Sequence, residues 1–258
     1  MSEFAGKPLD GRVVLIVGAT GGLGEAASVA AARAGATVVL LGRNVRRLNK
    51  VYDAVTAAGG EAMLYPMDLE GASPDDHLDM AERLKETFGR LDGLLHVAAE
   101  FRGLTPLEYT DPAQIARAMH INVTAPIWLT SAVLPVMKLS DDASVVFVVD
   151  DVDHVGKAHW GPYAAAQQAR AALVPMWAKE TEGSSVRIAG LQPGPMRTAL
   201  RAKATVEDID SRLRDPEAYA ADCVRLLSAA GRGAHGHIER VLAPEPTPTR
   251  VALSVLSS

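Results

Sequence analysis

Short apolar runs alternate with longer amphipathic stretches from Arg12 onward, and this alternation is the feature that most constrains the fold. The first run, Val13–Val17, is apolar at every position. A strand with no polar face must be buried on both sides, which is typical of a parallel sheet covered by helices. Strand-length and helix-length segments that alternate in this way predict parallel βαβ units.

The same pattern sets the expected order of elements. Strands are expected at Val13–Val17, Thr37–Leu41, Ala62–Met67, Leu91–Ala98, Ser144–Val149, Val186–Leu191 and His237–Leu242. Helices are expected at Leu23–Ala34, Val45–Ala58, Pro74–Phe88, Pro112–Lys138, Tyr163–Glu182 and Pro216–Ala230. Right-handed crossovers between these strands predict a single α/β domain of the doubly wound Rossmann type, with about seven parallel strands and helices on both faces. We expect it to span residues 1–243, followed by an extended Pro-containing tail at 244–258.

Composition narrows the class of partner. Hydrophobic residues make up 48% of the 258 residues and charged residues 22%, as in ordinary globular proteins. The net charge of -5 argues against a nucleic-acid or membrane-surface binder, because such proteins need a basic face. A single cysteine, Cys223, excludes an internal disulfide. With neither a signal peptide nor a transmembrane run apparent, the chain is expected to be cytoplasmic.

Glycines cluster where the first strand passes into the first helix, in Gly18-Ala19-Thr20-Gly21-Gly22-Leu23-Gly24. A glycine-rich turn before a helix lets backbone N–H groups approach a pyrophosphate, and the helix N-terminus adds partial positive charge. The spacing GxxxGxG differs from the general dinucleotide fingerprint, and a tight turn without a ligand is the alternative. Its place after the first strand favours a cofactor site formed by Gly18, Thr20, Gly22, Leu23 and Gly24.

The second strand should end beside the ribose of the adenosine half. Many NAD binders place an acidic residue there, whereas this chain has Gly42, Arg43 and Asn44. A cation at this position suits a 2′-phosphate, so NADP(H) is favoured over NAD(H), and Arg46 or Arg47 could reinforce the charge. The alternative is that these arginines form a solvated first helical turn. Asp68-Leu69, after the third strand, should meet the adenine, unless Asp68 only caps a loop.

At these residues the chain resembles the short-chain dehydrogenase/reductase family, from about Leu9 to Leu242 and most closely its bacterial YciK-like subgroup. The subgroup resemblance rests on Gly156–Tyr163 and Pro193–Leu200. It implies an oxidoreductase in which Tyr163 is the catalytic tyrosine and Asn122 the catalytic asparagine. It also implies cofactor contacts, which come from Ala98, Ala99, Pro193, Gly194 and Thr198.

The resemblance also shows where the chain departs from the family. The family lysine, four residues after the tyrosine, is Gln167 here, and the serine thirteen residues before it is Asp150. An ionised aspartate can only accept a hydrogen bond, and its charge disfavours a nearby tyrosinate. The fourth-strand motif Asn-Asn-Ala-Gly reads His96-Val97-Ala98-Ala99. These changes predict a weakened proton-transfer site beside an intact adenine half.

Two basic residues near the tyrosine raise the question of compensation. Lys157 could supply the missing charge, although a polar surface loop is the simpler interpretation. Arg170 follows Tyr163 by seven residues on a similar helical face, and we expect it at an interface or on the surface. Met196–Asp215 should form the substrate flap, without defining a substrate.

Two functions remain open at this point. One is NADP(H)-dependent reduction of a small carbonyl compound, or oxidation of the corresponding alcohol. The catalytic residues would be Asp150, Tyr163, Gln167 and Asn122, and the enzyme would have little or no activity. The other is a non-catalytic nucleotide-binding sensor or assembly subunit. No metal site is expected, and the resemblance implies a homodimer or homotetramer. Loss of the serine and lysine supports the second hypothesis, whereas the retained tyrosine supports the first.

Overall fold

The computed structural model describes residues 6–204 and 213–241. Seven strands form one parallel sheet in the order β3-β2-β1-β4-β5-β6-β7. The strands are β1 Val13–Val17, β2 Thr37–Gly42, β3 Glu61–Pro66, β4 Gly93–His96, β5 Ala143–Val148, β6 Val186–Pro193 and β7 Ile238–Val241. The doubly wound Rossmann-type fold predicted from the apolar runs is therefore confirmed.

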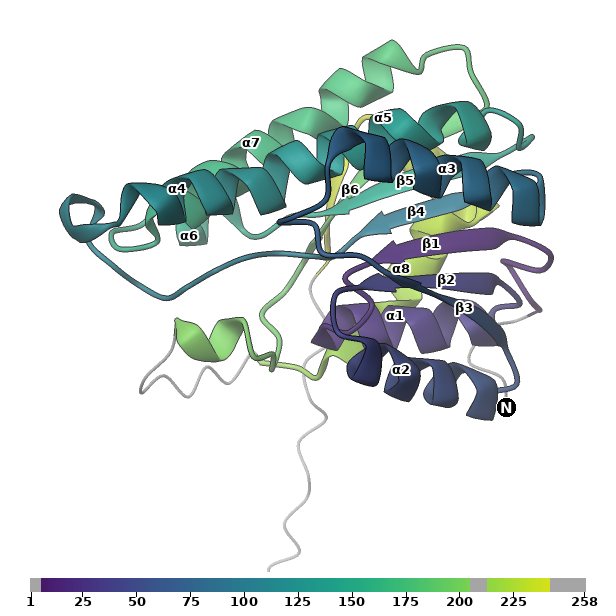
Figure 1. Cartoon of the computed structure of the whole chain (residues 1–258), viewed down its shortest axis with the longest axis horizontal. Coiled ribbons are helices and arrows are strands. Elements are labelled where there is room, and N and C mark those ends of the chain that lie inside the picture. The colour runs from purple at the N-terminus through teal and green to yellow at the C-terminus, as the bar shows by residue number, and fades with distance from the viewer. Residues whose placement is uncertain (1–5, 205–212, 242–258) are drawn as a thin grey trace, which may run out of the picture.

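Helices cover both faces of this sheet (Figure 1). One face carries α1 Gly22–Arg33, α2 Val45–Ala57 and α8 Ala220–Leu227. The other carries α3 Pro74–Phe88, α4 Pro112–Met119, α5 Ala125–Met137 and α7 Gly161–Glu180. The short helix α6 Val152–Val155 precedes α7, and single 3₁₀ turns lie at Leu107–Tyr109, Arg201–Lys203, Pro216–Tyr219 and Ala229–Ala234.

The long helix expected from Pro112 to Lys138 contains a π turn at His120–Thr124, between α4 and α5. Such turns widen the helix locally and are frequent at functional sites. The stretch Pro112–Met137 has the length and hydropathy of a membrane-spanning helix, but 56% of its most apolar window is buried inside the fold. It therefore packs as a core helix of this domain.

The point where the strand order reverses matters for the site. The order changes direction beside β1, because β1 pairs with β2 on one side and with β4 on the other. Ligands of open parallel sheets bind outside the carboxyl ends of the strands at such a switch point. The expected tail at 244–258, and the middle of the expected flap, lie outside the described residues.

Candidate active site

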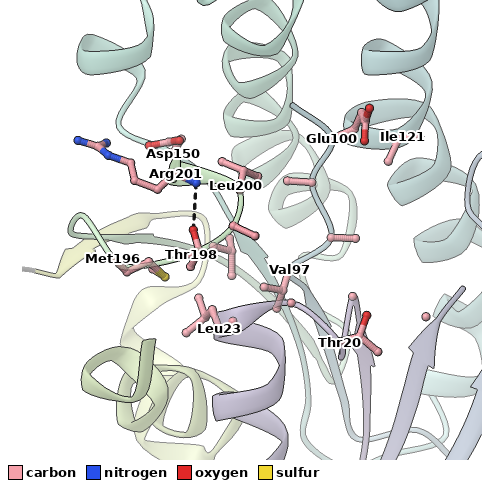
Figure 2. Close-up of a pocket in the computed structure, with 18 of the residues that line it drawn as sticks. Thr20, Leu23, Val97, Glu100, Ile121, Asp150, Met196, Thr198, Leu200 and Arg201 are labelled. Atoms are coloured by element: carbon pink, nitrogen blue, oxygen red, sulfur yellow. Dashed lines mark hydrogen bonds between the residues drawn. The ribbon is translucent and has the colours of Figure 1, made fainter. Parts of the chain in front are cut away.

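A cavity of about 380 Å³ lies at the carboxyl ends of the strands, on the switch point. Figure 2 shows Thr20 and Leu23 of the glycine turn on one side of it, Glu100 and Ile121 on another, and Asp150 with Leu200 and Arg201 on a third. Fifteen of the residues predicted from the sequence line it: Gly18, Thr20, Gly22, Leu23, Arg43, Asp68, Leu69, Ala98, Ala99, Asp150, Tyr163, Gln167, Pro193, Gly194 and Thr198.

The glycine turn is shaped by contacts that side chains would prevent. Gly18 has a φ of +93°, and a Cβ atom there would lie 2.6 Å from the backbone nitrogen of Ala98. A Cβ atom on Gly24 would lie 2.2 Å from the carbonyl oxygen of Gly18. The N-cap of α1, Gly21, has no side chain to accept from the first N–H groups of the helix. Those groups are therefore able to bind an anion such as a pyrophosphate.

Positive charge lines the cavity where β2 ends. Arg43 and Arg47 are exposed and both line it, whereas Arg46 does not. Arg47 also donates to the carbonyl oxygen of Thr20. Within the described ranges, no carboxylate forms an ion pair with either lining arginine. A nucleotide phosphate at this end would meet cations that are not already neutralised.

Two residues that were predicted to bind the cofactor, Gly24 and Asn44, do not line the cavity and instead contact nearby backbone atoms. Gly24 packs against the turn, and Asn44 is the N-cap of α2, where its side chain accepts from the Arg47 nitrogen at 3.0 Å. Asp68 lines the cavity, but its Oδ1 also accepts from the Glu70 nitrogen at 3.2 Å. Both of the roles considered for Asp68, a loop cap and a cofactor contact, are thus compatible with its position.

Asn122 lies in the π turn and is fully buried. Its Nδ2 donates to the carbonyl oxygens of Ala118 and Glu100 at 2.8 and 2.9 Å, and its Oδ1 accepts from the Glu100 nitrogen at 2.9 Å. The side chain therefore fastens the segment after β4 to the widened helix. The resemblance implies a catalytic role for Asn122, and in the structure its side-chain polar atoms hold the local helix geometry.

Tyr163 lies at the start of α7 and donates from its hydroxyl to Asp150 Oδ2 at 2.8 Å. Burial raises the pKa of Tyr163 well above its ordinary value, and the charge of Asp150 raises it further. Gln167, one turn later, accepts from the Asp150 nitrogen at 3.0 Å through Oε1. The structure thus brings these three sequence-predicted residues together, with the tyrosine proton directed at a carboxylate.

Arg170 contradicts the sequence-based expectation of a surface or interface residue. Only 1% of it is exposed, and its guanidinium donates to the carbonyl oxygens of His96 at 2.5 Å and Ala98 at 2.8 Å. Both acceptors are backbone carbonyls at or just beyond the end of β4, so the buried guanidinium has hydrogen-bond partners there. Lys157, in contrast, is exposed and does not line the cavity.

Glu100 and Ile121 line the cavity but were not predicted from the sequence. Glu100 pairs through Oε1 with Arg102 at 2.8 Å and with Arg117 at 3.2 Å. Ile121 directly precedes Asn122, and Glu100 directly follows the fourth-strand motif, so their adjacency to predicted site residues was the available signal. On the flap, Thr198 Oγ1 accepts from the Arg201 nitrogen at 3.1 Å, which closes a turn above the glycine loop (Figure 2).

Comparison with known proteins agrees with this arrangement. The family model for short chain dehydrogenases matches residues 12–208. The chain belongs to the short chain dehydrogenase family. It is 34% identical to the uncharacterized oxidoreductase YciK of Escherichia coli over 81% of this chain and 82% of that protein. The resemblance to the YciK-like subgroup is thereby confirmed.

Two solved structures of short chain dehydrogenases are also similar. One, from Shigella flexneri and complexed with NADP, has a TM-score of 0.86 and 32% identity, covering 91% of this chain and 98% of that one. The other, from Escherichia coli CFT073 and complexed with NADPH, has the same TM-score, identity and coverage. Family membership makes this chain an oxidoreductase-fold protein whose cofactor and chemistry have to be argued from its own residues.

Proposed function

We propose that the protein is an NADP(H)-dependent reductase of a small carbonyl compound, with slow proton transfer. The observation that carries this proposal is that Tyr163, which has a proton to donate from its hydroxyl, lines the same cavity as the glycine turn. The residues present fit this cofactor. The glycine turn leaves room for a pyrophosphate, and no carboxylate in the described part of the chain forms an ion pair with Arg43 or Arg47. NADP complexes of two similar short chain dehydrogenases support the same choice.

The cofactor would supply the hydride for the reduction, and the protein would bind the cofactor and supply the proton. When bound, NADPH supplies the hydride. The N–H groups at the start of α1 would bind its pyrophosphate, Arg43 and Arg47 its 2′-phosphate, and Asp68 its adenine. The hydroxyl of Tyr163 gives its proton to the carbonyl oxygen of the substrate.

Proton donation has a cost specific to this chain. The Tyr163 hydroxyl has to leave Asp150 before it can turn to a substrate, and the tyrosinate then forms beside a carboxylate. Because both effects oppose loss of the proton, reduction should be slow and alcohol oxidation, which needs the tyrosinate, slower still.

The test of this function is turnover of a broad panel of aldehydes and ketones with NADPH, compared between the parent and Tyr163→Phe. We expect measurable reduction in the parent and at least about a tenfold lower kcat in the variant, because phenylalanine keeps the packing but has no proton to give. NADPH affinity should be unchanged. Turnover that survives the substitution would contradict the proposal.

The second function, a non-catalytic nucleotide-binding protein, is favoured by the hydrogen bond from Tyr163 to Asp150, which occupies the only proton that the tyrosine can donate. Tight NADPH binding without turnover of any carbonyl would support it. The expected homo-oligomer and cytoplasmic location stay predictions.

Cofactor choice gives a separate prediction. Arg43→Ala should weaken NADPH binding about tenfold or more and leave NADH binding almost unchanged, because a charge-assisted contact to the 2′-phosphate is lost. Arg46→Ala is the matched control, since Arg46 is also exposed on the first turn of α2 but does not line the cavity. Fluorescence titration measures both affinities. Equal losses for NADPH and NADH in Arg43→Ala would argue against a 2′-phosphate contact.

A further inference from the structure

Arg170 is a buried cation held by carbonyl oxygens. Its Nη1 and Nη2 donate to Ala98 and His96, and its Nε has no hydrogen-bond partner. No carboxylate forms an ion pair with it in residues 6–204 and 213–241. Burial lowers the pKa of Arg170 to about 10, so the side chain still carries its charge at neutral pH.

The surroundings of Arg170 do not neutralise that charge. His96 stacks on Phe147 at a centroid separation of 4.8 Å, and its Nε2 contacts Thr130 Oγ1 at 2.9 Å. Burial and the nearby Arg170 hold the pKa of His96 well below its ordinary value, so the imidazole is neutral. An unpaired buried charge is costly to a fold, and a neutral side chain could fill the same volume. This cost suggests that the charge itself is used.

The group that could use it is Tyr163, on the same helix. Residues seven apart lie on one face of an α-helix, and α7 runs unbroken from Gly161 to Glu180. The charged groups that act on the phenol are Asp150, which opposes its ionisation, and Arg170 and Arg201, which favour it. Arg170 has the fixed position, because two carbonyls at the end of β4 hold it.

We propose that Arg170 is a positioning residue that supplies the positive charge stabilising the phenolate of Tyr163. This inference rests on the proposed carbonyl reduction. In that step NADPH would supply a hydride, with its electron pair, to the carbonyl carbon. The O–H bond of Tyr163 breaks as its proton goes to the carbonyl oxygen. The phenolate regains a proton from water. Arg170 touches neither cofactor nor substrate and acts only through the tyrosine and through the backbone that it holds.

The test measures this coupling from both sides by NMR, with ¹³C-labelled tyrosine and arginine. Both arms use Asp150→Ser as the parent, so that the phenol titrates at a lower pH. Arg170→Gln keeps an amide donor for the carbonyls but removes the charge, and we expect it to raise the titration midpoint of Tyr163. In the reverse arm, Tyr163→Phe should lower the titration midpoint of the Arg170 guanidinium, because coupling between two sites is reciprocal. This second arm leaves the Arg170 contacts in place.

Lys179→Gln is the matched control, because it removes one positive charge from the exposed end of the same helix and should shift neither midpoint. Circular dichroism and NADPH affinity establish that each variant is folded. The inference is overturned if neither midpoint moves in folded protein, or if Lys179→Gln moves them equally. Should Arg170→Gln not fold, the Tyr163→Phe arm alone decides.

These outcomes separate the inference from the proposed function. If carbonyl reduction is found, Arg170→Gln should lower kcat about tenfold with little change in NADPH affinity. Coupled titrations without any turnover would uphold the charge interaction and reject the reductase. Turnover with independent titrations would uphold the reductase and reject the role of Arg170.

Discussion

Replacing Asp150 with serine and Gln167 with lysine should together raise kcat for carbonyl reduction about 100-fold. Serine removes the carboxylate that accepts from the Tyr163 hydroxyl at 2.8 Å and can donate to a substrate carbonyl. Lysine adds a charge one helical turn from the tyrosine, and both changes lower the pKa of Tyr163 from its raised value. Each unit of that lowering is worth about tenfold in the population of tyrosinate, so alcohol oxidation should gain more than reduction.

The controls for this experiment come from the same helix. Gln168 is exposed beside the buried Gln167, so Gln168→Lys combined with Asp150→Ser adds the same charge away from the cavity. The single variant Gln167→Lys also loses the acceptor for the Asp150 nitrogen, and its gain should be smaller. Steady-state kinetics over pH measure the effect. A folded double variant that binds NADPH and turns over no faster than the parent would show that these two residues do not limit the rate.

Gly24→Ala should abolish nucleotide binding, with an NADPH dissociation constant at least about 100-fold higher. The added Cβ atom would lie 2.2 Å from the carbonyl oxygen of Gly18 and 2.9 Å from its carbonyl carbon. These are backbone atoms that cannot rotate away, so the turn has to open and its N–H groups lose their convergence. The same strain should cost about 1–3 kcal/mol of unfolding free energy.

Gly71→Ala is the matched control, because a Cβ atom at Gly71 has no neighbour within 4 Å. Calorimetry gives the two affinities, and thermal unfolding gives the two stabilities. Parent-like NADPH binding by Gly24→Ala would mean that the cofactor does not depend on the closed form of this turn.

The sequence was sufficient for the sheet and for the position of the glycine turn, because both depend on local patterns. The fully apolar run Val13–Val17 is β1 with the predicted bounds, and the glycine turn lies where its spacing placed it. Tyr163 and Asp150 could be paired only through the family resemblance. Their hydrogen bond follows from the fold, which brings the end of β5 to the start of α7.

The π turn and the burial of Arg170 were missed because neither leaves a local signal in the sequence. The π turn at His120–Thr124 keeps the apolar pattern of a helix, so its widening leaves no mark in hydrophobic periodicity. Arg170 was expected at an interface or on the surface, and arginines rarely lie fully inside a protein. Its partners are the carbonyls of His96 and Ala98, which lie 74 and 72 residues earlier in the chain. Backbone acceptors carry no side-chain identity, so the sequence cannot reveal such a contact.

Helix α7 carries three residues of the candidate site. Tyr163 is the proposed proton donor, Gln167 accepts from the Asp150 nitrogen just after β5, and Arg170 donates to the Ala98 carbonyl just after β4. One inserted residue between Tyr163 and Arg170 would rotate the later part of the helix by about 100° and move Arg170 off the face that carries Tyr163. Insertions and deletions in this stretch should therefore be far less tolerated than substitutions on its outer side. For protein engineers, the spacing of α7 is the fixed quantity, whereas the identity of exposed residues such as Ala165 and Ala172 is open to change.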